Sequence, residues 1–237
     1  MTSVQEFYDR QWDGTHDYVF SAAMKKAIEH SYFFLGVLSG KKIIEVGGGD
    51  GKQALYFAAQ GAIVTVIDIS AKSLKAVEQL AQQQGINIST MQMNAERLEF
   101  SNDSFDLVYI NSLFMHVNQQ KVLQECSRVL KKGGKLVIVE PLQYAPLVQV
   151  YRLFSSYRKM KPKYATLKMF KEGKKYFSAY QHQEFYFLSS ALLPLFYVKS
   201  KSLQSIYHAV SKLDNILLKI FAFLRYGCWV SVAQYTK

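Results

Sequence analysis

The chain has 237 residues, 49% of them hydrophobic and 14% aromatic, which suits one folded domain and excludes a disordered chain. Its two cysteines, Cys126 and Cys228, exclude a disulfide framework and favour a reducing compartment, the cytoplasm. Its net charge of +11 comes from residues 151–237, where 15 Lys and Arg outnumber 3 Asp and Glu, which predicts attraction to an anionic partner or simply a solvated face.

The distribution of charged and apolar residues argues against a secretion signal and against a membrane-spanning helix. The N-terminus has no basic region followed by an apolar region, so we expect no secretion signal. The longest apolar stretch, residues 214–227, is interrupted by Lys219 and Arg225, so we expect no spanning helix.

Apolar runs and helical patterns alternate along the first 141 residues. Residues 1–40 predict two helical pieces, the second over 21–38. The predicted strands are 43–46, 62–69, 86–93, 105–113 and 135–141, and the predicted helices are 52–60, 71–85 and 118–134, the last two closed by Gly85 and by Gly133 and Gly134. Nearly all-apolar strands that alternate with helices predict a parallel sheet covered on both faces, a doubly wound α/β fold.

After Pro141 this alternation stops. Residues 145–158 show helical spacing, 159–175 predict a Lys-rich connection or flap, 203–225 a helix on the sheet, and 228–237 a final strand. We expect one domain over 1–237. Its parts are an N-terminal helical lid (1–40), a core that binds the ligand (41–141), a basic, aromatic cap (142–200) and a C-terminal helix and strand (201–237).

A glycine-rich turn follows the first predicted strand. Ligands of a doubly wound sheet bind beyond the carboxyl ends of the strands, where Gly47 and Gly49 fall. Glycine permits a positive φ and a close approach of the backbone to a ligand. Lys52 stands where a dinucleotide fingerprint needs its third glycine, and a phosphate-binding P-loop motif is absent, so both of these sites are excluded.

Four motifs in order resemble one enzyme family. "EVGGGDG" (45–51), "MNAERLEF" (93–100), "FDLVYINSLFMHV" (105–117) and "RVLKKGGKLVIVEP" (128–141) are similar to those of the class I S-adenosylmethionine-dependent methyltransferases. This broad group includes the ubiquinone and menaquinone C-methyltransferases and many small-molecule O- and N-methyltransferases. The resemblance implies a seven-stranded, mostly parallel, Rossmann-like sheet with a helical cap inserted after the fifth strand. It also implies S-adenosylmethionine as cofactor.

The resemblance assigns the cofactor contacts of the first two strands. It implies that Glu45 anchors the methionine end of the cofactor and that Gly47, Gly48 and Gly49 lie against the methionine and the ribose. Asp68 matches the acidic residue that accepts hydrogen bonds from both ribose hydroxyls, a role that suits an acceptor-only carboxylate.

Further contacts are expected from the later motifs and the lid. Ile69 is expected beside the adenine. Asn94 replaces the aspartate that holds the adenine amino group, and it is otherwise read as an ordinary turn residue. The expected cofactor residues also include Ala95 and Glu96, which keep the family pattern, Asn111 and Ser112, which should line the methionine part, and Tyr8, which resembles an aromatic that covers the cofactor.

Methyl transfer to a hydroxyl or phenol benefits from a general base, and histidine is the usual one. His116, just beyond the fourth strand, is our candidate, with a structural role as its alternative. His16 in the lid is a further catalytic candidate. Glu140, at the end of the fifth strand, is expected to face the substrate, where it would orient a nucleophile or pair with His116, and Tyr144 is expected to line the acceptor pocket. We expect His30, His182 and His208 on the surface or on helix faces. No histidine–carboxylate cluster has the spacing of a metal site.

The aromatic cap and the cationic stretch Arg152–Lys175 predict an acceptor with an apolar body and an anionic part, such as a lipid-linked, glycolipid or carrier-linked metabolite. We expect O-methylation, with C- and N-transfer open, and peripheral contact of this stretch with an anionic membrane surface. An RNA methyltransferase is the second hypothesis, although no RNA-binding module accompanies the basic third. A cofactor-binding interaction subunit is the third. The chain is expected to be a monomer or a homodimer.

Overall fold

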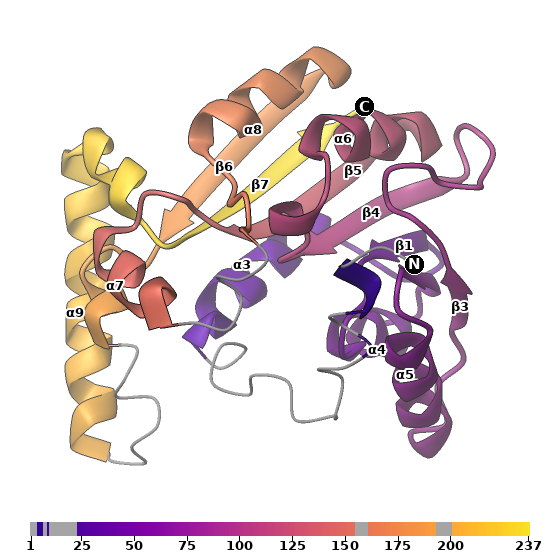
Figure 1. Ribbon diagram of the computed structural model, residues 1–237, viewed down its shortest axis with the longest axis horizontal. Coiled ribbons are helices and arrows are strands. Elements are labelled where there is room, and N and C mark those ends of the chain that lie inside the picture. Colours follow the sequence, from indigo (N-terminus) through magenta and orange to yellow (C-terminus); the bar gives the residue numbers. More distant parts are fainter. Residues whose placement is uncertain (1–3, 7–8, 10–22, 155–160, 193–200) are drawn as a thin grey trace.

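The computed structural model describes residues 4–6, 9, 23–154, 161–192 and 201–237. Seven strands form one sheet in the order β3-β2-β1-β4-β5-β7-β6 (Figure 1). The strands are β1 Lys42–Val46, β2 Ile63–Asp68, β3 Ser89–Gln92, β4 Phe105–Asn111, β5 Leu130–Pro141, β6 Ala179–Phe185 and β7 Val230–Thr236. Strands β1 to β5 are parallel, and β7 lies antiparallel between β5 and β6. The predicted doubly wound methyltransferase-type sheet is confirmed.

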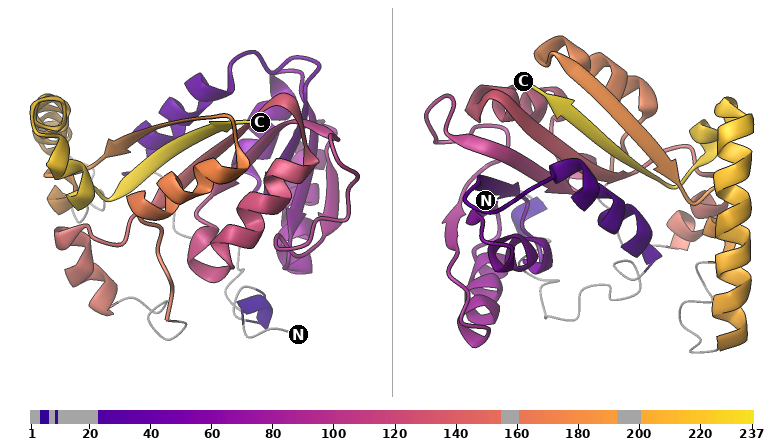
Figure 2. Two further views of the ribbon diagram at one scale, coloured as in Figure 1. Left: turned by 90° about the horizontal axis from the view of Figure 1, so that it is seen from above. Right: turned by 180° about the vertical axis from the view of Figure 1, so that it is seen from behind.

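Helices cover both faces of the sheet (Figure 2). They are α3 Lys25–Leu35, α4 Lys52–Ala59, α5 Ala71–Gln83, α6 Gln119–Val129, α7 Pro146–Phe154, α8 Leu167–Gly173 and α9 Lys201–Ile220, with the 3-10 helices η1 Phe114–His116, η3 Lys174–Tyr176 and η5 Ala222–Gly227. Residues of α3, α4 and α5 share one buried cluster with one face of the strands. Residues of α6 and α8 share a second cluster with the other face.

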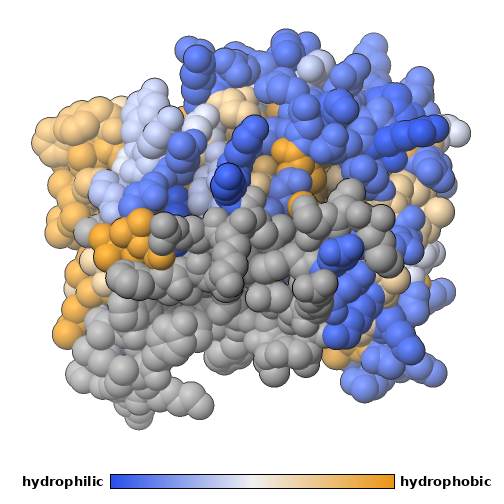
Figure 3. Space-filling model, in the orientation of Figure 1, coloured by the Kyte–Doolittle hydropathy of each residue, from blue (hydrophilic) through white to orange (hydrophobic). Residues whose placement is uncertain are grey.

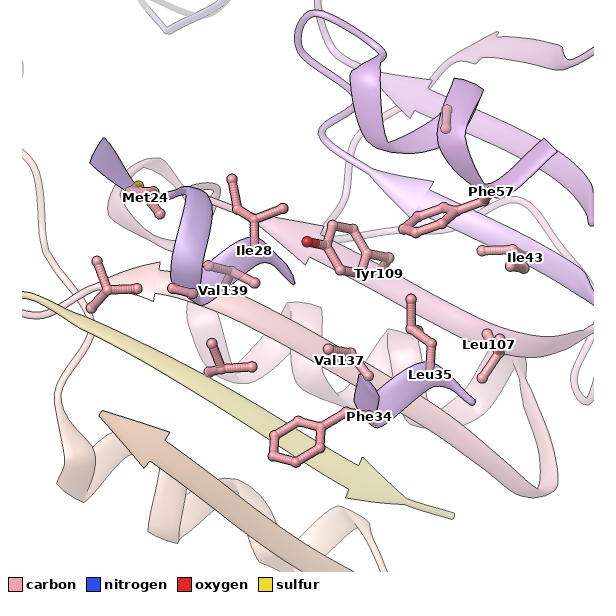
Figure 4. Close-up of a cluster of buried hydrophobic side chains, with 14 of the residues drawn as sticks. Met24, Ile28, Phe34, Leu35, Ile43, Phe57, Leu107, Tyr109, Val137 and Val139 are labelled. Carbon is pink, nitrogen blue, oxygen red and sulfur yellow. The ribbon is translucent and has the colours of Figure 1, made fainter. Parts of the chain in front are cut away.

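Side-chain alternation along each strand separates the two clusters. In β4, Leu107 and Tyr109 face α3 and α4, whereas Val108 and Ile110 face α6. Figure 4 shows Tyr109 among Phe57, Ile43 and Ile28 of the first cluster. The Tyr109 hydroxyl lies 3.0 Å from Ser31 Oγ, which satisfies the one polar atom of this fully buried ring.

One helix end differs from the prediction. Helix α6 ends at Val129, before the glycines, because Leu130 adopts extended backbone angles and pairs with Phe105 of β4. The Lys-Lys-Gly-Gly run therefore belongs to β5 instead of closing the helix, and an irregularity of the register between Phe105 and Leu107 takes up the extra residues.

The segment after β5 is less helical than its predicted cap. Residues 179–185 form the strand β6, which was not predicted because its polar residues Gln181, His182 and Glu184 resemble a loop. Conversely, the predicted flap 159–175 holds α8 and most of η3 in its described part, with Met169 and Phe170 buried against the sheet.

Helix α9 stands at the edge of the molecule beyond β6 and β7 (Figure 1). The stripe expected to pack on the sheet includes Ile206, Tyr207 and Leu213. Tyr207 packs against the first buried cluster, but the prediction is wrong for Ile206 and Leu213, which are 49% and 45% exposed. The helical spacing is real, but Ile206 and Leu213 face outward. No helix in the described part of the chain is both long and apolar enough to cross a membrane.

Candidate active site

The turn after β1 is held by the end of β2. The amides of Gly47 and Gly48 both donate to the carbonyl oxygen of Ile67, at 2.8 and 3.1 Å. Gly47 has a φ of +78°, in the left-handed region that favours glycine. A Cβ atom on Gly48 would lie 2.0 Å from Cγ1 of Val66, so the turn can lie this close to β2 only with glycine there. The carboxyl ends of β1 and β2 are therefore so close that no side chain fits at Gly48.

Asp68 binds this turn directly. The Gly49 amide donates to its Oδ2 at 3.2 Å, and the Ser70 amide donates to its Oδ1 at 2.9 Å. Burial raises the pKa of Asp68, while these backbone donors act in the opposite direction. A carboxylate has about four acceptor positions, and the Ile69 backbone is a third donor to Asp68, so at least one position remains for a further donor. Asp68 is thus oriented by the very turn that the sequence assigned to a ligand.

The segment after Asp68 adds polar residues that the sequence analysis missed. Ser70 caps α5 by accepting from the Ser73 amide, and Ser73 Oγ donates to the Gly49 carbonyl at 2.7 Å. Ser70 Oγ also donates to Asp9, and Lys72 Nζ donates to the Asp9 carbonyl oxygen. Asp9 therefore brings the N-terminal segment to the edge where Asp68 lies. A serine directly before the first residue of the predicted helix 71–85 would have revealed Ser70 as a cap.

Glu45 is a carboxyl group in the interior, 1% exposed on β1. Its Oε2 has no hydrogen-bond partner among the described residues, while the Ala54 backbone donates to the carboxyl. Burial, followed by the neighbouring Asp50, raises its pKa well above the ordinary value. A buried oxygen without a donor is costly, so this atom marks a place where a polar ligand group would be stabilised.

The predicted adenine contacts form a turn of their own. Asn94 is exposed, and its Oδ1 accepts the Glu96 amide at 2.9 Å, which is the arrangement of an ordinary turn residue. Ala95 is buried between these two residues. Glu96 accepts the amide of Asn118 at 2.7 Å and pairs with Lys121 at 3.6 Å, so it anchors the start of α6. Ile69 is half-buried beside Asp68, and Gln92 Nε2 donates to its carbonyl oxygen.

The loop after β4 is fixed by Glu140. Its Oε1 accepts the amides of Leu113 and Phe114, at 2.6 and 2.8 Å. The carboxyl is fully buried and its pKa is raised to about 8 by that burial. Its Oε2 has no hydrogen-bond partner in the described part of the chain. Oε1 of Glu140 therefore holds the loop after β4, and Oε2 is the oxygen left for the catalytic role predicted from the sequence.

Asn111 and Ser112 end β4 at the same edge. Ser112 has a φ of +57°, and its amide donates to the Val139 carbonyl, which turns the chain toward Leu113. Its hydroxyl donates to Asn111 Oδ1 at 3.1 Å. The Leu113 side chain in turn lies within 3.0 Å of the Cβ position of Gly47, so this loop borders the glycine turn. Both half-buried polar side chains thus stand beside the predicted methionine site.

His116 is the last residue of η1, and its amide donates to the Leu113 carbonyl oxygen at 3.2 Å. Burial lowers the pKa of its imidazole to about 4, so the ring is neutral at physiological pH. A neutral imidazole can accept a proton, which a general base requires. His116 and Glu140 both bind the backbone of Leu113: His116 donates to its carbonyl oxygen, and Glu140 accepts its amide.

Other predicted residues lie elsewhere. Tyr8 and His16 fall outside the described residues. Tyr144 is 58% exposed. Arg152 donates to the carbonyl oxygens of Leu142 and Gln143 and stacks on Tyr164 at 3.6 Å, so it clamps the chain after β5. Within the described ranges, no group of three or more His, Cys, Asp or Glu side chains is arranged to hold a metal ion.

The remaining histidines have structural neighbours. His30 lies on a helix face, as expected, in edge contact with Phe34, and burial lowers its pKa. His182 lies on β6, with Nδ1 2.6 Å from the buried Glu184. His208 is exposed on α9.

Comparison with known proteins finds similarity to one group of enzymes. Residues 44–138 match the sequence family described as "Methyltransferase domain". The chain is 36% identical over 129 residues to the ubiquinone/menaquinone biosynthesis C-methyltransferase UbiE of Psychromonas ingrahamii, covering 51% of each chain. It is 34% identical over 100 residues to a ubiquinone biosynthesis O-methyltransferase of Coxiella burnetii, covering 42% of this chain and 43% of that one. It spans about half the length of the curated relatives that it matches.

A solved structure extends the likeness in fold to the whole chain. Phosphoethanolamine N-methyltransferase 2 of Haemonchus contortus, in complex with S-adenosyl-L-methionine, superposes with a TM-score of 0.72 at 17% identity. The match covers 100% of this chain and 60% of that one.

Proposed function

Because the chain belongs to the class I S-adenosylmethionine-dependent methyltransferases, we propose that it transfers a methyl group from S-adenosylmethionine to a small-molecule acceptor. One observation supports this proposal above the others. The Gly49 amide binds the Asp68 carboxylate, so the glycine turn and the predicted ribose acceptor form one unit at the carboxyl edge of the sheet.

The residues present fit the cofactor. Asp68 keeps at least one acceptor position for a ribose hydroxyl, and the unpartnered Oε2 of buried Glu45 is suited to a donor from the methionine end. Asn94 fits less directly, since its side-chain oxygen already accepts the Glu96 amide. When bound, S-adenosylmethionine supplies an electrophilic methyl group on a sulfonium, so the protein chiefly has to orient the acceptor.

We propose that the nucleophile is an oxygen and that His116 takes its proton. The imidazole is neutral at working pH because burial lowers its pKa to about 4, and it lies two residues beyond the loop that Glu140 fixes. The low pKa makes it a weak base, which suits an acidic hydroxyl such as a phenol better than an alkyl alcohol. Glu140 acts as a positioning residue in this scheme, since its Oε1 holds loop amides.

The lowered pKa of His116 and the names of the relatives support an acceptor class. Two of the relatives compared act in ubiquinone biosynthesis by their names, and one of them is an O-methyltransferase. We propose an aromatic, quinone-like acceptor with an apolar body and an anionic part. C- or N-methylation of such a metabolite is the alternative, and RNA is disfavoured because the one observation in its favour is the positive charge of the last third.

The test has two steps that fail separately. Calorimetry with S-adenosylhomocysteine measures cofactor binding alone, and absence of binding by the wild-type protein would overturn the methyltransferase proposal. Transfer of a labelled methyl group to a panel of phenols, amines and transfer RNA then identifies the acceptor class. Binding with transfer only to amines, or only to RNA, would retain the cofactor site and overturn the O-methylation scheme.

A further inference from the structure

The outward side of α9 carries apolar side chains that nothing in the described structure covers. Ile216 and Ile220 are 54% and 64% exposed, and Phe223 in the following η5 is 69% exposed. Figure 3 shows this surface as orange atoms along the left edge, where α9 and η5 lie in Figure 1. Contiguous exposed apolar surface of this kind usually marks a site of interaction.

Away from its buried side, the residues of α9 divide the helix lengthwise. At 100° per residue they form two adjacent stripes, one apolar and one polar. The apolar stripe consists of Ile206, Ala209, Val210, Leu213, Ile216, Leu217 and Ile220, and the polar one of Gln204, Ser205, His208, Lys212, Asn215 and Lys219. Exposed Phe221, Phe223 and Tyr226 follow the end of α9.

A third, inward side attaches α9 to the rest of the molecule. Asp214 is buried and accepts the amides of Leu188 and Ser189 and the Ser189 hydroxyl. Lys26 of α3 donates to Ser211 and Asn215, at 2.8 and 3.0 Å. The helix is therefore held by its polar inward contacts while its apolar stripe faces outward.

The charges on this surface are of one sign. Asp214, which points inward, is the only acidic residue in α7, α9 and η5. Lys212 and Lys219 are exposed on the polar stripe, next to the apolar one. An amphipathic helix with lysines beside its apolar stripe is typical of proteins that lie in the interface of an anionic membrane.

We propose that the outward side of α9, together with η5, binds the surface of an anionic phospholipid bilayer. The apolar stripe and the aromatic side chains of η5 enter the boundary between headgroups and acyl chains, and the lysines contact lipid phosphates. The site is distinct from the predicted membrane-contact stretch Arg152–Lys175, whose first cation is engaged with Leu142 and Gln143. The inference does not depend on the proposed methyl transfer.

A second copy of the chain is a poorer partner for this surface. In a two-fold symmetric contact through α9, Lys212 and Lys219 would meet the same lysines, with no acidic side chain on the outward side to pair with them. A bilayer with anionic headgroups supplies both the apolar phase and the negative charge. Nucleic acid would supply the charge but would leave the apolar stripe in water.

The experiment is vesicle flotation of the full chain, with phosphatidylcholine vesicles that do or do not contain phosphatidylglycerol. We expect binding to the anionic vesicles, with an affinity about fivefold lower for each lysine removed in Lys212→Gln/Lys219→Gln. Ile216→Ser/Ile220→Ser should lower it roughly tenfold or more, because two apolar side chains no longer leave water. Circular dichroism and S-adenosylhomocysteine binding verify that each variant is folded.

Two control variants remove the same chemistry from other surfaces. Phe33→Ser/Val37→Ser removes apolar side chains that are 80% and 79% exposed near the end of α3, and Lys168→Gln/Lys171→Gln removes two exposed lysines of α8. Neither should change vesicle binding. If the α8 variant loses binding while the α9 variants keep it, the proposal is wrong and the stretch first predicted from the sequence is the membrane contact.

Two further results would overturn the proposal. One is absence of binding to the anionic vesicles by the wild-type chain. The other is a dimer in sedimentation that Ile216→Ser/Ile220→Ser dissociates, since the stripe would then be a self-association surface. If the isoleucine variant does not fold, the lysine variant together with loss of vesicle binding in high salt decides the outcome.

Discussion

The backbone amide of Leu113 donates a hydrogen bond to Oε1 of Glu140, at 2.6 Å, and so joins the end of β4 to the end of β5. The same oxygen accepts the amide of Phe114. A single buried carboxyl thus orients the loop that leads from Ser112 to His116. Because the Leu113 side chain also borders Gly47, the position of this loop affects the glycine turn.

Removal of that acceptor should destabilise the fold and the site together. In Glu140→Ala the amides of Leu113 and Phe114 lose their partner, at a cost of roughly 1–3 kcal/mol each when buried. Loss of the buried carboxyl itself recovers part of this, so we expect the free energy of unfolding to fall by about 2 kcal/mol, measured by urea denaturation. Glu140→Gln keeps an oxygen acceptor and should retain most of the stability, whereas equal losses in both variants would contradict the positioning role.

The same carboxyl predicts how stability depends on pH. Its pKa is raised to about 8 in the folded protein from an ordinary value of 4.5. Between these values the folded state keeps a proton that the unfolded state releases, so the free energy of unfolding falls as pH rises, by up to roughly 1.4 kcal/mol per pH unit. The contribution is complete below about pH 4.5 and lost above about pH 8.

Glu140→Gln isolates this contribution, because it leaves every other titrating group in place. Relative to the wild type, the variant should gain stability steadily from pH 5 to pH 8 in urea denaturation. Parallel stability curves for the two proteins over that window would show that Glu140 is ionised in the folded state.

Asp68 should be indispensable for cofactor binding. Asp68→Ala removes the acceptors proposed for the ribose hydroxyls and the partner of the Gly49 amide, so we expect S-adenosylhomocysteine affinity to fall by at least 100-fold, on the scale of about 1.5–3 kcal/mol for each hydrogen bond to a charged group. Asp106→Ala is the control. Asp106 begins β4, where it accepts the Lys42 amide and pairs with Lys131. Normal binding by Asp68→Ala in calorimetry would place the ribose elsewhere.

Sequence periodicity predicted the parallel half of the fold because those strands are buried on both faces. Ile43, Ile44 and Val46 are apolar without alternation, as a covered strand requires. Strand β6 could not be recognised in the same way, since Gln181, His182 and Glu184 give it the appearance of a polar loop. Glu184 is nevertheless buried, because His182 on the same strand and Ser231 of β7 supply its partners, the second only after β6 and β7 have paired.

The sequence predicts features of the candidate site that depend on local backbone conformation, such as the glycine turn. It does not predict contacts between residues that are distant in sequence. The need for glycine at Gly48 follows from the proximity of Val66, and the motif conveys it. In contrast, the expectation that Glu140 faces the substrate rested on strand direction alone. That it binds the Leu113 amide depends on how β4 and β5 are aligned, which the local sequence does not contain.

His116 should affect turnover and not cofactor binding. If its imidazole is the base, His116→Ala should lower kcat by roughly 10²–10⁴-fold while S-adenosylhomocysteine affinity in calorimetry changes little. Since burial lowers its pKa to about 4, the acid limb of the wild-type pH profile should lie near pH 4 rather than 6.5, and it should disappear in the variant. Unchanged kcat in His116→Ala would assign the residue a structural part.

The contact between Gly48 and Val66 predicts a compensating pair of substitutions. Gly48→Ala places a methyl group 2.0 Å from Val66 Cγ1, and the resulting overpacking should cost about 1–3 kcal/mol of stability. Val66→Ala alone opens a cavity in a fully buried position of β2 and also destabilises the protein. In the double variant the new methyl group occupies space vacated by valine. The double variant should therefore lose at least about 1 kcal/mol less stability than the sum of the losses of the two single variants.

Gly49→Ala is the matched control. Its cost comes from a φ of +50° instead of a side-chain collision, so the losses of Gly49→Ala and Val66→Ala should be additive. The losses are measured by urea denaturation. If those of Gly48→Ala and Val66→Ala are also additive, the turn moves away from β2 and does not depend on that contact.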